Sequence, residues 1–249
     1  MAKLKLEDVR KYIEENIGSF HESRENSLGE LKLSTILLKK NPYLFKAKNI
    51  LTSEMFVRKL VDAYLSSQEE TMFGAFLEQL AIFVCKKVYS GRKSSAEGLD
   101  LEFEKENVIY VVTVKSGTNW GNASQIAKMK DNFRQAKQRL RTNAKKIPVE
   151  AINGCCYGRI VKIDKGEYQK IAGQRFWEFI SDNEDLYTEI IEPLGHKAKE
   201  RNEAFDESYA RMLNIFTVQF SNEFCVDGAI NWNKLVKFNS GKEKVKVKI

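Results

Sequence analysis

The sequence predicts a mixed α/β (α+β) fold in which a small mixed sheet lies between helical N-terminal and C-terminal layers. Two kinds of pattern lead to this prediction. Apolar and acidic residues alternate over residues 99–104, and a β-branched and aromatic run follows over residues 108–115, as expected of two strands. Apolar residues recur at helical spacing over residues 73–88 and 123–141. We therefore expect a strand pair with one helix before it and one after it.

Helices are expected to dominate the chain before this strand pair. Helical apolar spacing is found over residues 6–17 and again over residues 52–65, and Asn41-Pro42 between them predicts a turn. In the next predicted helix, residues 73–88, apolar residues recur at i, i+3, i+4, i+7, i+8 and i+11. This spacing predicts a broad buried stripe along that helix.

The chain after residue 141 is expected to supply one more strand and then further helices. Residues 151–163 are apolar enough for a central strand that continues the sheet. Residues 168–180 and 187–220 have helical patterns, the second interrupted at residues 193–195. Residues 232–238 predict a last packed element.

No internal repeat or low-complexity linker divides the sequence, so we expect a single domain over residues 1–249. Its expected parts are a helical N-terminal layer (1–70), a core (71–165) and a mainly helical C-terminal layer (166–249).

Composition excludes several classes of protein. A chain of 249 residues with 43% apolar content can bury a proper core. No apolar run approaches the roughly 18 residues of a membrane span, and the first residues lack the apolar region of a signal peptide, so a cytoplasmic location without membrane partners is expected. The four cysteines include no CxxC pair, and Cys155 and Cys156 are adjacent in an apolar segment, which favours reduced core thiols over a zinc site.

Positive charge is concentrated in one segment. The whole chain has a net charge of +7, from 41 basic and 34 acidic residues. Residues 123–148 alone carry the same net charge, because their one acidic residue is Asp131 and their basic residues are Lys128, Lys130, Arg134, Lys137, Arg139, Arg141, Lys145 and Lys146. Such a basic stripe is the electrostatic footprint of a polyanion partner, although a solvated lysine-rich helix face has the same pattern.

The predicted hairpin carries charged residues where they need an explanation. Residues 105–107 form its turn, and an antiparallel return of the second strand brings Thr113 and Lys115 beside Asp100. An unpaired buried charge is costly, so a carboxylate and an ammonium at the end of a buried hairpin indicate either chemistry or an ion pair that holds the hairpin together.

The order of these elements and two short sequence motifs within them resemble a known enzyme superfamily. A helix with Glu78, a strand with Asp100, a strand ending in Lys115, a helix and another strand are similar to the αβββαβ core of the PD-(D/E)XK nucleases. Two sequence motifs resemble its type II restriction endonucleases in particular. They are Gly98-Leu-Asp-Leu-Glu-Phe and Val114-Lys-Ser-Gly-Thr-Asn-Trp-Gly-Asn122. The detailed match covers roughly residues 73–125, within the core that would then be the catalytic part of a single nuclease domain.

The resemblance implies a magnesium site and a reaction. Phosphodiester hydrolysis is extremely slow without a catalyst, and oxygen ligands suit Mg²⁺, which can clamp the scissile phosphate. Asp100 would be the central metal ligand, and the carbonyl of Val114 could add another. Lys115 would orient or deprotonate the attacking water, or stabilise the charged phosphorane. The products would carry 5′-phosphate ends.

Two residues depart from the superfamily pattern. Leu99 stands before Asp100 where the motif has proline, a change that the superfamily tolerates. Thr113 stands where the motif usually has a glutamate or aspartate, and its hydroxyl cannot replace the lost charge. In related enzymes the second carboxylate has moved to another element. Glu78 on the preceding helix is the first candidate for that role, and Glu102 is the second.

The loop that leaves the second strand is the predicted DNA-reading segment. Its amides suit adenine edges, and the nearby basic residues suit phosphates or guanine. Two positions are open for Trp120, stacked on nucleic acid or packed beneath the loop. The expected DNA contacts are Ser116, Asn119, Trp120, Asn122, Gln125, Lys128, Arg134, Lys137 and Arg141.

The leading functional hypothesis is a sequence-specific double-stranded DNA endonuclease that requires Mg²⁺. By resemblance it would act as a homodimer on palindromic sites, and a DNA methyltransferase would protect the same site in its host. Two alternatives stay open. One is a structure-specific repair nuclease or junction resolvase of the same fold, and the other is a DNA-binding module without catalytic activity.

Overall fold

The computed structural model describes residues 3–143 and 147–242, and the side chains of residues 141–143 lie outside what it describes. The chain forms two compact units. The sheet unit consists of Met1–Gly18 and Phe73–His196, and the helical unit consists of Ser19–Met72 and Lys197–Ile249. Helices α1 (Leu6–Gly29) and α4 (Ser53–Tyr89) contribute to both. The two units do not follow the predicted layers 1–70, 71–165 and 166–249, and those layer boundaries stay a prediction.

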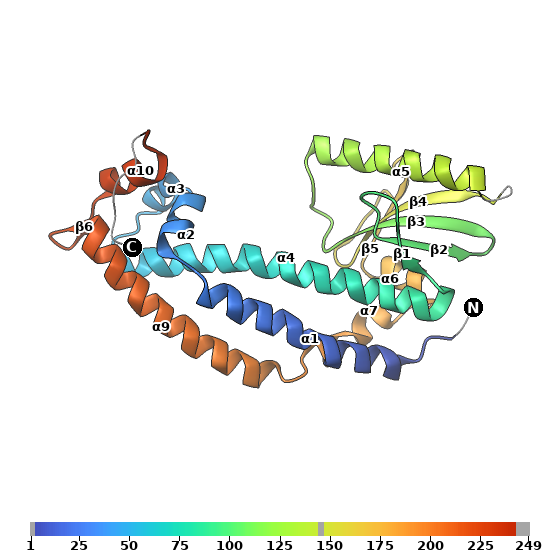
Figure 1. Ribbon diagram of the computed structural model, residues 1–249, viewed down its shortest axis with the longest axis horizontal. Coiled ribbons are helices and arrows are strands. Elements are labelled where there is room, and N and C mark those ends of the chain that lie inside the picture. The colour runs from blue at the N-terminus through green and yellow to red at the C-terminus, as the bar shows by residue number, and fades with distance from the viewer. Residues whose placement is uncertain (1–2, 144–146, 243–249) are drawn as a thin grey trace. The chain divides into compact units, whose positions relative to one another are not determined.

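Five strands form the mixed sheet of the sheet unit, in the order β1-β2-β3-β4-β5 (Figure 1). Strand β3 is central, antiparallel to β2 and parallel to β4, while β1 and β5 lie at the edges. This confirms the predicted mixed α/β class. The strand bounds are β1 Arg92–Lys93, β2 Leu101–Lys105, β3 Val108–Lys115, β4 Val149–Cys155 and β5 Gln169–Ala172.

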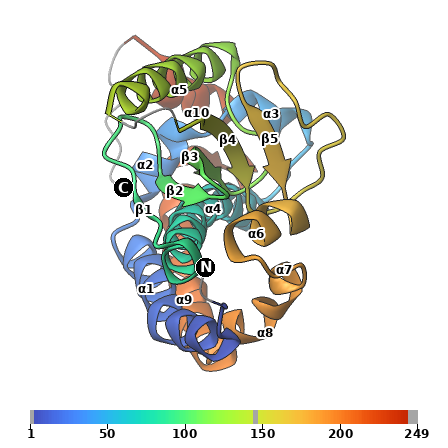
Figure 2. The ribbon, with the colours of Figure 1, turned by 90° about the vertical axis from the view of Figure 1, so that its right-hand side faces the viewer.

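Helices cover both faces of this sheet (Figure 2). On one face lies α5 (Ala123–Asn143), whose Met129 and Phe133 belong to one buried cluster with Val111 and Ala151. On the other face, the ring of Phe103 in β2 stacks on Tyr89 of α4 at 5.3 Å between ring centroids and meets Phe179 of α6 edge-on, also at 5.3 Å. Helix α6 spans Gln174–Ser181, and the short α7 (Leu186–Glu189) and α8 (Ile191–Leu194) follow it.

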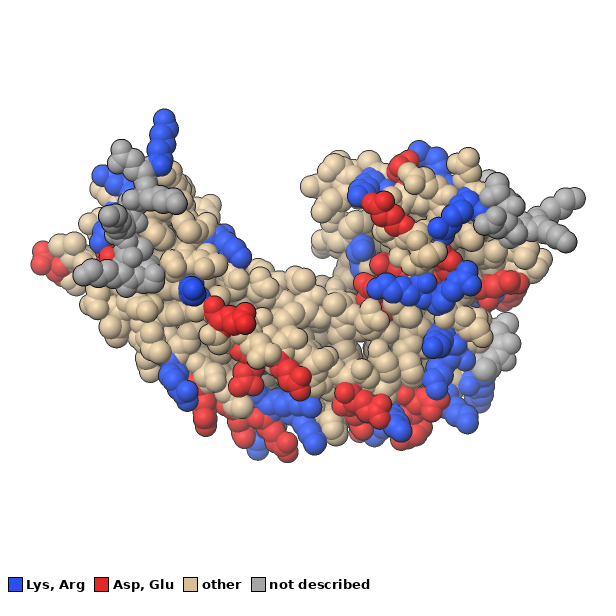
Figure 3. Space-filling model, in the orientation of Figure 1, with Lys and Arg blue, Asp and Glu red and all other residues tan. Residues whose placement is uncertain are grey.

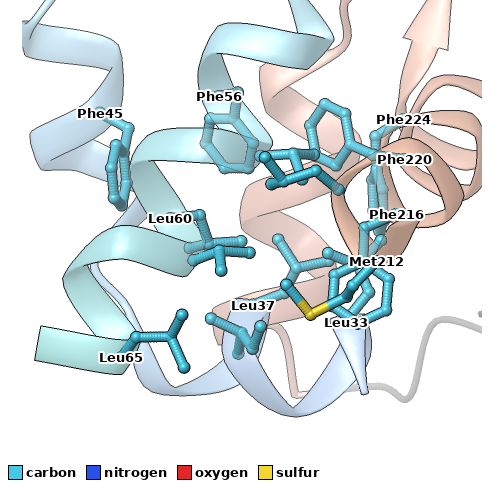
Figure 4. Packing of buried hydrophobic residues seen from close by; sticks show 14 of the residues in the cluster. Leu33, Leu37, Phe45, Phe56, Leu60, Leu65, Met212, Phe216, Phe220 and Phe224 are labelled. Atoms are coloured by element: carbon cyan, nitrogen blue, oxygen red, sulfur yellow. The ribbon is translucent and has the colours of Figure 1, made fainter. Parts of the chain in front are cut away.

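The helical unit has its own apolar core (Figure 4). Helices α2, α3, α9 and α10 surround it together with parts of α1 and α4. Phe56 of α4 stacks on Phe220 of α9 with 4.6 Å between ring centroids, and both side chains are almost fully buried. The remaining bounds are α2 Leu33–Lys39, α3 Pro42–Ala47, α9 Ala198–Phe224, α10 Trp232–Ser240, β6 Cys225–Val226 and β7 Ala229–Ile230.

Several sequence predictions agree with these elements. The hairpin, its turn at residues 105–107, the helix over residues 123–141 and the last packed element near residue 232 are confirmed as β2–β3, α5 and α10. Asn41 caps α3 and accepts hydrogen bonds from the backbone N–H groups of Tyr43 and Leu44, with Pro42 at the first helical position. The four cysteines are free thiols. In the part of the chain that the structure describes, no helix has the length and hydropathy to span a membrane.

Helix lengths were predicted too short in the first part of the chain. The helix predicted over residues 6–17 continues to Gly29, and the two helices predicted over residues 52–65 and 73–88 are one continuous helix, α4. The intervening residues 66–72 are mostly polar but include neither proline nor glycine, so nothing in the backbone stops the helix there.

The elements after β3 differ more. The strand predicted over residues 151–163 ends at Cys155, and Val161 is fully exposed in the loop that follows. The helix predicted from residue 168 is instead β5, which pairs with β4, and α6 begins only after Gly173 at φ 57°. The helix predicted over residues 187–220 is divided into α7, α8 and α9. Pairing with β4 overrides the helical pattern, since strand formation depends on a neighbouring strand.

The alternation that the sequence predicts over residues 99–104 is present only in part. Leu101 and Phe103 are buried in β2, but Leu99 precedes the strand and packs in the α5 cluster with Val111. Regular pairing with β3 therefore begins at Leu101, and Glu102 between the two apolar residues is itself buried.

Replacing Phe56 by alanine should lower the free energy of unfolding by about 3–5 kcal/mol, because it leaves a cavity against Phe220. Urea unfolding followed by tryptophan fluorescence measures this, since the Trp232 ring lies 5.8 Å from that of Phe56. Tyr43→Ala, at a side chain of the same unit that is 61% exposed, is the matched control and should change stability by less than about 0.5 kcal/mol. Equal losses in the two variants would contradict this core.

Candidate active site

Asp100 is fixed by backbone hydrogen bonds at the start of the hairpin. Its N–H donates to the carbonyl of Val112 at 2.9 Å, and its carboxylate oxygen Oδ2 accepts from the N–H of Val114 at 2.7 Å. The side chain is 18% exposed. The carboxylate is thus held at the end of β3, with Oδ2 committed to the backbone of that strand.

Lys115 is the last residue of β3 and lies against this carboxylate. Its ammonium nitrogen Nζ is 3.9 Å from Asp100 Oδ2, and its side chain is 34% exposed. The same nitrogen lies over the indole ring of Trp120, 5.4 Å from the ring centroid. The predicted approach of Asp100 and Lys115 is therefore present.

Glu78 reaches the same place from α4. Burial raises the pKa of its carboxyl, and the nearby Asp100 carboxylate raises it further, while Lys93 and Lys115 oppose the shift. Its oxygen Oε1 lies 3.8 Å from Lys93 Nζ. Burial also raises the pKa of Asp100, against the Val114 hydrogen bond and the ammonium of Lys115. Two carboxyl groups and two ammonium groups thus gather at one site.

Thr113 takes no part in this cluster. The residue is buried, its hydroxyl Oγ1 accepts a hydrogen bond from Asn153 Nδ2 at 3.0 Å, and it donates to Met129 Sδ at 3.7 Å. Its hydrogen bonds thus run to β4 and α5. The position where the motif usually has an acid is therefore used for interior hydrogen bonding.

Glu102 is engaged elsewhere. It is 4% exposed, although the alternating pattern predicted it on the polar side of a half-buried strand. Oε1 accepts from Ser94 Oγ at 2.6 Å and from Arg139 Nη2 at 3.5 Å, and Oε2 accepts from Arg92 Nη2 at 3.2 Å. Burial is tolerated because both oxygens are paired. Of the two candidate acids, Glu78 is the one whose pKa the Asp100 carboxylate raises.

The loop after β3 uses several predicted DNA contacts as structural groups. Asn122 and Gln125 form a reciprocal cap at the start of α5. Asn122 Oδ1 accepts from the Gln125 N–H at 3.0 Å, and Gln125 Oε1 accepts from the Asn122 N–H at 2.9 Å. Trp120 Nε1 donates to Asn153 at 3.2 Å, so the indole packs beneath the loop. Asn119 is exposed and Ser116 is half-buried.

Acidic partners accompany the basic stripe on α5. Lys128 pairs with Glu97 at 3.1 Å, and Lys137 with Glu150 at 3.8 Å. Arg134 pairs with both Asp131 at 3.1 Å and Glu167 at 3.3 Å. Figure 3 shows acidic and basic side chains intermingled over the sheet unit. The side chain of Arg141, and Lys145 and Lys146, lie outside the described residues. Exposed pairs are weak, so these residues can still exchange partners with phosphates.

Sequence reasoning missed two residues of this neighbourhood. Lys93 contacts Glu78 from the edge strand β1, and the sequence marks it only as one basic residue in a polar loop. Asn153 is fully buried between Thr113 and Trp120. A polar amide inside the apolar run of β4 was a signal that could have identified it.

The donor set fits a hard divalent cation. Within residues 3–143 and 147–242, no three histidine, cysteine or acidic side chains gather closely enough to hold a metal by themselves. Glu78 and Asp100 supply two carboxylates, and the remaining ligands would have to be carbonyl oxygen and water. Mg²⁺ is commonly bound in this way, through one or two carboxylates with several waters retained.

A mixed sheet flanked by helices, with an acid pair and a lysine at the end of its central hairpin, is consistent with a restriction-endonuclease-like nuclease. The family model described as Type II restriction endonuclease EcoO109I matches residues 7–202, which is more than half of the chain. The chain therefore belongs to this family of type II restriction endonucleases, enzymes that hydrolyse DNA. Comparison with the curated proteins gives no match.

Glu78→Gln should raise the free energy of unfolding of the metal-free protein at about pH 8, by on the order of 1 kcal/mol. The folded protein binds the Glu78 proton more tightly than the unfolded chain, because the pKa is raised. The wild type therefore loses stability as pH rises from the ordinary pKa, about 4.3, through the raised one. Glutamine avoids this loss.

Urea unfolding with a chelator present measures the effect at about pH 8 and about pH 4. The gain should shrink toward the lower pH, where the native carboxyl is protonated. Glu104→Gln, an exposed change on the same hairpin, is the control. A gain of equal size at both pH values, or in both variants, would contradict the raised pKa of Glu78.

Proposed function

We propose that this chain is a Mg²⁺-dependent, sequence-specific endonuclease that cuts both strands of double-stranded DNA and leaves 5′-phosphate ends. The observation that carries the proposal is the convergence of Glu78, Asp100 and Lys115 in a member of a type II restriction endonuclease family. The αβββαβ core of the PD-(D/E)XK nucleases is part of the same proposal, supported by the order α4, β1, β2, β3, α5, β4.

Asp100 and Glu78 would hold the metal, and the carbonyl oxygen of Val114 is the proposed third protein ligand. The hydrogen bond from the Val114 N–H occupies Asp100 Oδ2 and orients the carboxylate, which leaves Oδ1 for a cation. A bound divalent ion would supply positive charge to the scissile phosphate and make a coordinated water more acidic. Thr113 has no role as a ligand in this proposal, since its hydroxyl is bonded to Asn153 and Met129.

Lys115 would act on the attacking side. Its side chain is partly exposed and lies beside Asp100. Lys115 would orient the attacking water or stabilise the negative charge of the pentacovalent phosphorane as an ammonium, or would deprotonate that water as a neutral amine. Water oxygen forms the new bond to phosphorus, the bond to the 3′ oxygen breaks, and the phosphate stays on the 5′ end of the downstream strand.

Four charged groups gather at the candidate site. Glu78 and Asp100 repel one another, and the ammonium groups of Lys93 and Lys115 offset that repulsion. A divalent ion at the acid pair would release Lys93 from Glu78. The long, exposed side chain of Lys93 would then be available to the negatively charged DNA backbone.

Recognition and assembly complete the proposal. Asn119 and Ser116 remain available on the loop after β3, while Lys128, Arg134 and Lys137 would exchange their acidic partners for phosphates. We further propose a homodimer acting on a palindromic site, and a companion DNA methyltransferase that protects that site.

Incubating unmodified phage or plasmid DNA with the protein and Mg²⁺ should give discrete fragments whose sequenced ends carry 5′-phosphates. Asp100→Ala and Lys115→Ala should each lower the cleavage rate at least about 100-fold, because the first removes a proposed metal ligand and the second removes a cation that would stabilise the reacting phosphate. Asp8→Ala removes an exposed ion pair with Lys87, elsewhere in the sheet unit, and should cut at the wild-type rate.

Other outcomes would identify the alternatives. Cleavage restricted to branched or damaged DNA would replace the proposal with a repair nuclease or junction resolvase. Salt-sensitive DNA binding without metal-dependent cleavage would replace it with a binding module.

A calorimetric titration with Mg²⁺ should show which of the two candidate acids, Glu78 or Glu102, binds the metal. Glu78→Gln should weaken metal binding at least about tenfold, since it removes a charged ligand. Glu102→Gln should leave metal affinity unchanged but lower the free energy of unfolding by about 1–3 kcal/mol, because Arg92 and Arg139 lose their carboxylate. The reverse pattern would assign the ligand role to Glu102.

A further inference from the structure

A chain of buried hydrogen bonds leads from the interior of the sheet to the candidate active site. Asn153 of β4 lies in parallel register with Thr113 of β3 and has no exposed surface. Its amide Nδ2 donates to Thr113 Oγ1 at 3.0 Å, and its Oδ1 accepts from Trp120 Nε1 at 3.2 Å. Both ends of one amide side chain are therefore used, one in the sheet and one in the loop after β3.

A buried amide at this position is unfavourable for folding unless its polar atoms have hydrogen-bond partners. The neighbours of Asn153 in β4, Ile152 and Gly154, are buried with it, and a branched apolar residue would fill the interior without needing partners. Asparagine is tolerated because its donor and acceptor are both satisfied. The arrangement also gives the buried Thr113 hydroxyl a partner, at the position where the superfamily motif usually has an acid.

The series of hydrogen bonds ends at the indole ring of Trp120. The ring packs in part against the buried cluster between α5 and the sheet, while the loop around it is rich in small polar residues and includes Gly121 at φ 75°. Apolar packing is non-directional, so the direction of the indole edge depends on its hydrogen bond. The hydrogen bond to Asn153 fixes the indole edge, and the ring lies under the ammonium of Lys115, whose other neighbour is Asp100 at 3.9 Å. Lys115 is thus held between an aromatic face and a carboxylate.

We propose that Asn153 is a positioning residue, which holds Trp120 so that the indole ring keeps the Lys115 ammonium in place for catalysis. This inference rests on the proposed function only in taking Lys115 as catalytic. Lysine has a long flexible stem, and an ammonium over an aromatic face is attracted by the ring. Releasing the ring lets the ammonium leave its place, and a displacement of about 1 Å near the reacting atoms can cost a hundredfold in rate.

The kinetic test uses Asn153→Leu, Trp120→Phe and the double variant. Phenylalanine keeps an aromatic face but has no N–H donor, so Trp120→Phe cuts the same link as Asn153→Leu from the other side. Each single variant should lower kcat about tenfold to a hundredfold, while KM and DNA affinity measured with Ca²⁺ in place of Mg²⁺ stay unchanged. Because both changes break one link, the double variant should be no slower than the slower single variant.

Ser181→Ala is the matched control. Ser181 is another buried polar side chain of the sheet unit, and it donates to the carbonyl of Trp177 at 2.6 Å, in α6. It should lose stability in urea unfolding without losing kcat. Two results would show that Asn153 only supports folding. One is a kcat loss in the double variant equal to the product of the two single losses, and the other is a kcat loss in Ser181→Ala that matches its loss of stability.

A spectroscopic test needs neither metal nor DNA. The chain has three tryptophans, so a nitrogen–proton correlation spectrum should contain three indole resonances, and the one lost in Trp120→Phe belongs to Trp120. Asn153→Leu should shift this resonance and speed its proton exchange, and Lys115→Met should shift it as well. Ser181→Ala should leave it in place.

The two tests separate the possible failures. An unmoved Trp120 resonance in Asn153→Leu overturns the positioning role, whatever the nuclease activity. A resonance that shifts as expected in a wild-type protein that cuts no DNA would instead refute the proposed function, and with it the catalytic part of this inference.

Discussion

The hydrogen bond from the Val114 N–H to the Asp100 carboxylate is the contact on which the site depends. It joins the residue before β2 to the end of β3, beyond the regular ladder of the hairpin. Strand β3 is itself held on both sides, by β2 and by β4, so its end is a rigid reference point. Lys115, one residue further, therefore meets Asp100 at 3.9 Å.

Charge balance is the second constraint. Burial raises the pKa of both Glu78 and Asp100, and the Asp100 carboxylate raises that of Glu78 further, so a neighbourhood with both acids is unfavourable for the folded protein unless cations lie close by. Lys93 and Lys115 meet this need from two different strands. Proteins often accept such a local cost where a site must bind a ligand. The same frustration would make the site receptive to a divalent cation.

Local sequence predicted elements well where short-range contacts decide them. The β2–β3 hairpin and α5 follow from their own periodicity, because the residues that pair or share a face lie close together in sequence. Prediction failed where a distant partner decides. The segment Gln169–Ala172 becomes a strand because β4 offers an open edge. The break predicted within α4 was wrong for a local reason, since residues 66–72 contain neither proline nor glycine.

The sequence by itself determined the nuclease resemblance, the hairpin and the approach of Asp100 to Lys115, since these depend on motif residues within one supersecondary unit. Tertiary structure alone decided where the two candidate acids lie. It brought Glu78 beside Asp100, buried Glu102 against two arginines and turned Thr113 toward Asn153. These outcomes depend on how α4, α5 and β4 pack on the hairpin, and packing between segments distant in sequence leaves no local pattern to read.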